Sequence, residues 1–80
     1  MNKETVLLKL KEIFNTLNPD VKSETITLES KLKEDLSMTS LSMVYIVVAI
    51  ENEFDIDMSD VSFNTFNCVN DVVEYILNNL

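Results

Sequence analysis

The chain has 80 residues, of which 6 are lysine, none is arginine or histidine and 14 are acidic, so its net charge is −8. This length suits one domain, residues 1–80, and 46% apolar residues suffice for one compact core. Without histidine and with one cysteine, neither a zinc site nor a Ser-His or Cys-His nucleophile pair can be assembled, and the acidic balance disfavours binding to nucleic acid. We therefore expect no catalytic residue, no metal site and no nucleic-acid partner.

The first predicted element is an amphipathic helix over residues 3–17. Its apolar side chains recur at steps of three and four residues: Val6, Leu7, Leu10, Ile13, Phe14 and Leu17. Pro19 ends this helix, because the residue before a proline is pushed out of the helical region. Residues 20–39 keep no helical period, so we expect a long loop with at most one short turn, anchored by spaced apolar residues: Val21, Ile26, Leu28, Leu32 and Leu36.

A second helix is predicted over residues 40–54, with Thr39 as its N-cap. The β-branched content would also suit a buried strand, but the length and the polar end Glu51-Asn52-Glu53 favour a helix. We assign one helical face to Leu41, Val44, Val47, Val48 and Phe54, and the stripe is widened by Met43, Ile46 and Ile50. Since the segment is apolar on nearly every side, it is either the central helix or presents an apolar face to a partner.

The remaining residues predict a connector and one or two further helices. Residues 55–58 form the connector, and Ser59 to Phe66 have room for a short helix with Val61, Phe63 and Phe66 inward. A last amphipathic helix begins at Asn67 or Cys68 and places these residues inward: Val69, Val72, Val73, Ile76, Leu77 and Leu80. The predicted fold class is all-α, a small three- to four-helix bundle with a long loop between helices 1 and 2.

Charge is distributed unevenly along the chain. All six lysines lie in residues 1–33, whereas residues 34–80 hold nine acids and no base. Such a surface suits a basic partner. We also expect crowding of like charges to raise the pKa of the acids in residues 34–80 and to limit stability, so that added salt stabilises the protein.

Three local features suggest other chemistry, and each has a plainer explanation. Residues 55–59 imitate the first half of a calcium loop, but the positions that need Gly and Glu hold Asp60 and Phe66, so we expect an acidic turn. The single Cys68 suits a reducing compartment and is expected to be a small core residue. No signal peptide opens the chain, and its longest apolar-rich stretch, residues 43–50, is too short to span a membrane. We expect a cytoplasmic chain.

The most specific signal is a set of short motifs at fixed spacing. Glu34-Asp35-Leu36 is followed by Ser40-Leu41 and then by Glu51-x-Glu53-Phe54-Asp55. In an acidic chain of 80 residues with helices at these places, this arrangement resembles the acyl carrier protein family. The resemblance runs without gaps from about residue 21 to residue 76, and it includes further matches at Val21-Lys22, Leu32-Lys33, Ala49-Ile50, Ile56 and Val73-Glu74-Tyr75-Ile76.

The resemblance implies that the chain is a carrier and not an enzyme. Ser40 would receive 4′-phosphopantetheine from coenzyme A through a separate Mg²⁺-dependent phosphopantetheinyl transferase. The thiol of this arm would then carry acyl intermediates as thioesters for fatty acid or polyketide-type biosynthesis. Independently of the family, a serine in the first turn of a helix places a phosphodiester near unpaired N–H groups and the positive end of the helix dipole.

The resemblance also implies partners, which are acyl-transferring and condensing enzymes with basic or apolar docking surfaces, and a carrier that is itself a monomer. The residues expected to bind these partners are Thr39, Leu41, Val44, Tyr45, Val48, Glu51, Glu53 and Asp60. Ser42, Tyr45 and Asn52 stand where carriers of fatty acid synthesis usually have carboxylates, so we expect generic enzymes of that pathway to use this chain poorly.

Two further departures concern the attachment site itself. Thr39 replaces the family's Asp before the serine, and Ser37 replaces the usual Gly, so Ser37 is strained if its position needs a positive φ. Two alternatives stay open. One is an aminoacyl or peptidyl carrier of a dedicated pathway, and the other is an unmodified helical adaptor that binds through the face of Val44 and Val48. The intact mass of the protein from its native host distinguishes a modified carrier from the adaptor.

Overall fold

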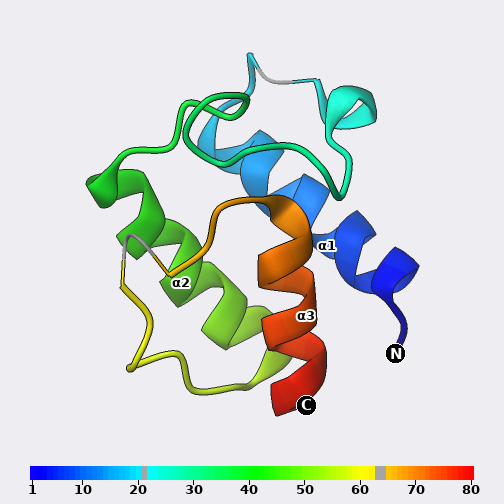
Figure 1. Cartoon of the computed structure of the whole chain (residues 1–80), viewed down its shortest axis with the longest axis vertical. Helices are drawn as coiled ribbons and strands as arrows, with labels where there is room; N and C mark the ends of the chain where they lie inside the picture. Colours follow the sequence, from blue (N-terminus) through cyan, green and yellow to red (C-terminus); the bar gives the residue numbers. More distant parts are fainter. Residues whose placement is uncertain (21, 63–64) are drawn as a thin grey trace.

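Three α-helices and two long connections make up the part of the chain that the structure describes (Figure 1). The computed structural model describes residues 1–20, 22–62 and 65–80. The helices are α1 (Lys3–Leu17), α2 (Ser40–Phe54) and α3 (Val69–Asn79), and a 3₁₀ turn, η1 (Ser23–Thr25), lies in the first connection. Within the described residues, β-pairing is limited to one isolated bridge, between Lys31 and Cys68. The predicted all-α bundle is confirmed, and none of its described helices is long and apolar enough to cross a membrane.

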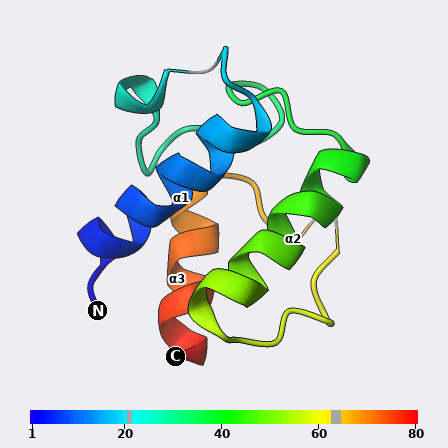
Figure 2. The same ribbon diagram turned by 180° about the vertical axis from the view of Figure 1, so that it is seen from behind.

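Helix α1 lies against both other helices, as the view from behind shows (Figure 2). The Asn2 side chain caps its start by accepting the N–H of Thr5 at 2.9 Å, and its last turn closes with the Asn18 N–H on the Phe14 carbonyl at 2.9 Å. Its buried side chains are Val6, Leu10 and Phe14. The predicted helix over residues 3–17 is therefore confirmed.

Helix α2 forms over the predicted residues, and Thr39 caps it by accepting the Ser42 N–H on its hydroxyl at 3.2 Å. The face grouped from the sequence does not coincide with the buried side of α2. The buried residues are Met43, Ile46, Ile50 and Phe54, whereas Leu41, Val44 and Val48 are exposed. Since α2 is apolar nearly all round, its own pattern does not select the inner face, and contact with α1 and the connections does.

Helix α3 begins at Val69, one residue beyond the predicted start at Asn67 or Cys68, and Leu80, which was predicted to face inward, is exposed. The Asp71 carboxylate accepts the N–H groups of Asn67 and Cys68 at 2.9 and 3.2 Å, which caps the helix start. The short helix predicted over residues 59–66 is wrong for the residues described there, since residues 59–60 form a turn and residues 61–62 and 65–66 are not helical. The Ser62 N–H donates to the Thr65 hydroxyl at 2.8 Å, a side-chain bond that competes with helix formation.

Two more predictions for the residues 59–66 segment concern side-chain burial. Phe66 is buried, as predicted, and packs edge-on against Tyr75 with ring centroids 5.6 Å apart. Val61 is half-buried, and Phe63 lies outside the described residues.

The first connection is an ordered part of the core. Its buried apolar side chains are Ile26, Leu32, Leu36 and Met38, and Leu28 packs against them; the predicted anchor at Val21 lies outside the described residues. Backbone bonds join this connection to the start of α3: Leu32 N–H to Asn67 O at 3.0 Å, Val69 N–H to Ser30 O at 2.9 Å, and Asn70 N–H to Leu28 O at 2.9 Å. The pairing holds the turn that leads into α2.

Candidate functional site

Ser40 is the first residue of α2, and its side chain is exposed to solvent. The cap formed by Thr39 fixes the backbone on one side of it, and the bond from the Met43 N–H to the Thr39 carbonyl, at 2.9 Å, starts the helix on the other. The Ser40 hydroxyl is therefore held on a defined backbone and is open to a second protein.

The start of α2 provides a favourable environment for an anion attached to Ser40. The N–H groups of Ser40 and Leu41 have no acceptor inside the helix, because helix geometry leaves the first donors unpaired. The first turn carries no acidic residue, so the positive end of the helix dipole is not offset there by a carboxylate of α2. Both features would stabilise a phosphodiester on the Ser40 hydroxyl.

A largely apolar groove begins at Ser40 and runs between α2 and residues 58–62. It has a volume of about 380 Å³ and is lined by Ser40, Met43, Val44, Val47, Val48, Met58, Ser59, Val61 and Ser62. Its floor includes the buried Met58, whose N–H donates to the Glu51 carboxylate at 2.8 Å. The groove is therefore a place where an arm on Ser40 could meet apolar surface without opening the core.

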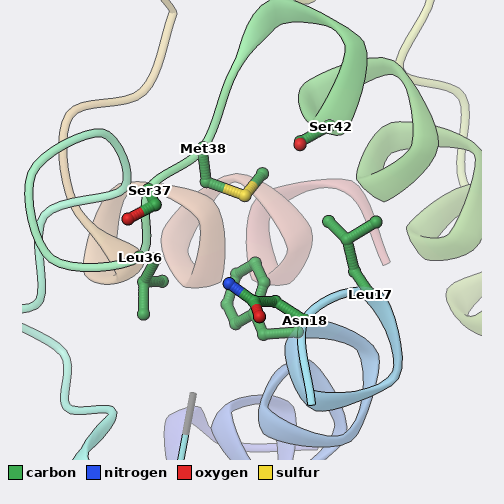
Figure 3. A pocket seen from close by; sticks show the side chains of 7 residues that line it. Leu17, Asn18, Leu36, Ser37, Met38 and Ser42 are labelled. Atoms are coloured by element: carbon green, nitrogen blue, oxygen red, sulfur yellow. The ribbon is translucent and has the colours of Figure 1, made fainter. Parts of the chain in front are cut away.

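A second, smaller pocket lies between the end of α1 and the start of α2 (Figure 3). It has a volume of about 140 Å³ and is lined by Phe14, Leu17, Asn18, Leu36, Ser37, Met38 and Ser42. Ser37 lines this pocket and has φ 55°, so the condition under which a serine is strained at this position is met. A non-glycine residue in this region is strained, since its Cβ approaches the following carbonyl oxygen.

The outward side of α2 is an exposed apolar surface. The exposed fraction is 81% for Leu41, 62% for Val44, 51% for Tyr45 and 50% for Val48. Together with Leu17 of α1 and Ser42, these side chains line an open groove of about 550 Å³. We call the five apolar residues Leu17, Leu41, Val44, Tyr45 and Val48 the α1–α2 apolar face. Four of them were predicted to bind partners.

The three acids predicted to bind partners do not line this groove. Glu51 accepts the Met58 N–H, and Glu53 pairs with Lys9 of α1, with 3.6 Å between the carboxylate oxygen and Nζ. Asp60 accepts the Tyr75 hydroxyl at 2.7 Å, and this hydrogen bond raises the pKa of the Tyr75 phenol above its usual value. The structure brings Thr39, Leu41, Val44, Tyr45 and Val48 together near Ser40, and it ties the acids to other elements.

The expectation of raised acid pKa values is wrong for two residues. The Ser59 N–H lowers the pKa of the Asp57 carboxyl, and the N–H groups of Asn67 and Cys68 lower the pKa of the Asp71 carboxyl. Hydrogen bonds to the charged form outweigh the opposing effect of burial at these two sites. Among the described residues, no group of three or more potential ligands is arranged to hold a metal ion.

Sequence reasoning missed several contributors to the site. Leu17 is the last apolar residue of the α1 stripe, which gave no sign that it also borders α2. Ser42 was noted only as a missing carboxylate, although it lines the same groove. Met58 was placed in a connector, yet it is buried beneath the groove at Ser40. The signal available in the sequence was that Met58 is an apolar residue next to the acids Asp55 and Asp57, which favours burial of its side chain.

Comparison with known proteins places this geometry in a family context. The family model described as "Phosphopantetheine attachment site" matches residues 9–76. The chain is 36% identical to "Acyl carrier protein" of Onion yellows phytoplasma (strain OY-M) over 92% of its own length and 96% of that protein. It is 38% identical to "Acyl carrier protein" of Phytoplasma australiense over 94% of its own length and 97% of that protein.

A solved structure resembles the fold as well. The solution structure of the apo doublet acyl carrier protein from prodigiosin biosynthesis superposes with a TM-score of 0.78 at 22% identity. The match covers 95% of this chain and 36% of that one. At this identity the likeness concerns the fold.

Proposed function

The chain belongs to the acyl carrier protein family, whose members carry acyl groups on a covalently attached 4′-phosphopantetheine, and on this premise we propose that Ser40 is the attachment residue. The observation that supports it best is the exposed Ser40 hydroxyl at the first position of a capped helix whose first turn has no acid. When bound, the arm supplies a terminal thiol that holds acyl groups as thioesters.

The residues around Ser40 fit such an arm. The N–H groups of Ser40 and Leu41 would stabilise its phosphodiester, and the Thr39 cap holds those N–H groups in place. The apolar groove of about 380 Å³ beside Ser40 would shield the apolar part of a cargo from water. We propose that this one domain catalyses no step itself, since the transferase and the partner enzymes would supply all the chemistry.

Partner enzymes of a carrier must reach the modified serine. We propose that they contact the chain near Ser40, and that the contacting residues come from the set Thr39, Leu41, Val44, Tyr45, Val48, Glu51, Glu53 and Asp60. The partners are a phosphopantetheinyl transferase and the acyl-transferring and condensing enzymes of fatty acid or polyketide-type biosynthesis. A cytoplasmic location is part of the proposal, because the free Cys68 suits a reducing compartment.

Attachment is tested by incubating the protein with coenzyme A, Mg²⁺ and a broad-specificity phosphopantetheinyl transferase. We expect the intact mass to increase by one 4′-phosphopantetheine and peptide mapping to locate it on Ser40. Ser40→Ala should abolish the increase and keep the helical circular dichroism, since the side chain is exposed. Ser37→Ala and Ser42→Ala are the matched controls and should still be modified. Attachment at Ser37 or Ser42, or none in the unaltered protein, would contradict the proposal.

A further inference from the structure

Residues 57–62 of the second connection form one wall of the apolar groove beside Ser40, and we call them the groove wall. They follow the end of α2 and run back along this helix toward its first turn (Figure 1). The groove wall contains no helix. A segment without regular hydrogen bonds of its own is held by the side chains that tie it to its neighbours, so these ties decide the shape of the groove.

The Tyr75 hydroxyl of α3 ties the groove wall to the rest of the bundle. It donates to the Asp60 carboxylate at 2.7 Å and, at a longer 3.3 Å, to the Asp57 carbonyl, so one hydroxyl holds both sides of the turn between these residues. The Tyr75 ring is itself fixed, because it is half-buried against the core and packs edge-on against Phe66. Tyr75 does not line the groove, so its effect on the groove passes through the groove wall.

The turn held by Tyr75 contains Met58, which closes the floor of the groove. Met58 is buried and lines both the groove and the part of the core that Phe66 borders. Its N–H donates to the Glu51 carboxylate, and its carbonyl accepts the Val61 N–H at 3.0 Å. A displacement of the groove wall would therefore move Met58 and open the apolar surface of the groove to water.

The tie depends mainly on Asp60. The hydrogen bond to Asp60 raises the pKa of the Tyr75 phenol above its usual value, and burial and the charges of Asp60, Asp57 and Glu51 raise this pKa further. The phenol therefore keeps its proton at neutral pH and remains a donor. A donor bonded to a carboxylate makes a stronger hydrogen bond than one bonded to a neutral carbonyl, so Asp60 is the more important of the two acceptors.

We infer that Tyr75 is a positioning residue of this carrier: its hydroxyl, acting through Asp60 and Asp57, holds the groove wall in place and so keeps a cargo on Ser40 shielded from water. The inference rests on the proposed function and adds a residue of α3 to that site. It is carried by the geometry, in which one fixed phenol bonds both sides of the turn that closes the groove.

The test measures how well the groove protects a thioester. Ser40 of the full chain is loaded from octanoyl-coenzyme A by a broad-specificity phosphopantetheinyl transferase with Mg²⁺, and intact mass confirms the loading. Hydroxylamine, which cleaves thioesters, is then added at pH 7, well below the Tm of each variant. We expect the unaltered protein to be cleaved more slowly than free octanoyl-pantetheine. Tyr75→Phe should be cleaved about two- to fivefold faster than the unaltered protein, because losing one hydrogen bond shifts the opening of the wall by about that factor.

Further variants separate positioning from general stability. Thr25→Val is the matched control, since it also removes a hydroxyl that donates at 2.7 Å but lies in η1 and does not line the groove; it should leave the cleavage rate unchanged even if it lowers Tm. Asp60→Ala should be cleaved as fast as Tyr75→Phe, and the double variant no faster than either, because both remove the same bond. Asp60→Asn keeps an acceptor oxygen and should raise the rate less than Asp60→Ala does.

Amide hydrogen exchange provides a second measurement, at the N–H groups of Met58 and Val61. Their exchange should be faster in Tyr75→Phe by about the same factor as thioester cleavage, and unchanged in Thr25→Val. Faster exchange with an unchanged cleavage rate would show that the hydroxyl only stabilises the turn, and would overturn the inference.

Other outcomes would overturn it as well. They are a cleavage rate in the unaltered protein equal to that of free octanoyl-pantetheine, an equal rise in Thr25→Val and Tyr75→Phe, or rates that multiply in the double variant. If Ser40 is loaded and Tyr75→Phe behaves like the unaltered protein, the inference fails and the proposed function stands. If the transferase leaves Ser40 unmodified, the proposed function fails and the inference fails with it.

Discussion

Replacing Ser37 with glycine should stabilise the protein. Ser37 precedes the buried Met38 and has φ 55°, a conformation that costs a residue with a Cβ about 1–2 kcal/mol. Glycine removes that cost, but its greater freedom in the unfolded chain returns about 0.5–1 kcal/mol. The expected net gain in the free energy of unfolding is about 0.5–1 kcal/mol.

The gain is measurable by urea and thermal unfolding followed by circular dichroism. For 80 residues, the entropy of unfolding is about 0.17 kcal/mol/K, so Ser37→Gly should raise Tm by about 3–6 °C. Ser37→Ala keeps the Cβ and should give no such gain. The Ser40 hydroxyl should be modified as before, because the substitution leaves the cap at Thr39 intact.

A matched control uses a second exposed serine. The described non-glycine residues with positive φ are Ser37 and Asp55, so Ser59 adopts a conformation that suits any residue. Ser59→Gly should therefore destabilise the protein by about 0.5–1 kcal/mol. If Ser37→Gly destabilises it to the same extent, the strain argument is refuted, and the turn before α2 does not depend on the backbone preference of residue 37.

Four further predictions concern the core, the cap of α3, the charge and the attachment site. Ile50→Ala should lower the free energy of unfolding in urea by about 2–5 kcal/mol, whereas Val48→Ala should change it by less than about 0.5 kcal/mol; equal losses would place Val48 in the core. Asp71→Asn should cost about 0.5–2 kcal/mol at neutral pH. Because the folded-state pKa of Asp71 is lowered, the stabilisation by its carboxylate is fully present above the ordinary pKa and is lost as pH falls through the folded-state pKa. A stability difference between the unaltered protein and Asp71→Asn that persists in strong acid would contradict this prediction. Tm at pH 7 should rise with NaCl, since residues 34–80 hold nine acids and no base, and a flat Tm would argue against repulsion. Thr39→Asp should raise the rate of Ser40 modification by a lysine-rich transferase about two- to fivefold, and an unchanged rate would show that this enzyme ignores residue 39.

The sequence alone determined the helices and the residue that starts α2. The apolar residues of α1 recur every three or four residues, and Asn2 and Pro19 flank the helix at its two ends. Local pattern therefore specified that helix. The cap at Thr39 followed likewise, because a cap is a contact between residues close in sequence. The cap at Asp71 is equally local but was not predicted. Ser40 was singled out by the family resemblance of the motifs around it.

Tertiary structure decided which side of α2 is buried. Met43 and Val44 are neighbours of similar character, yet one is in the core and the other exposed. A helix that is apolar nearly all round has no preferred inner side until its neighbours pack against it. The apolar pattern of α2 therefore could not assign the α1–α2 apolar face, and the four residues of it that were predicted to bind partners came from the family resemblance.

Tertiary structure also decided where the long connections go and what the acids contact. The bonds from Leu32 to Asn67 and from Val69 to Ser30 join segments more than thirty residues apart, and no short motif marks such pairs. Glu53, one of the residues proposed to contact a partner enzyme, also pairs with Lys9 of α1, because folding brings the two helices together. Contacts between distant residues depend on the packing of the whole chain. The sequence therefore indicated the serine that is proposed to carry the arm, and the fold decided which side chains are exposed beside it.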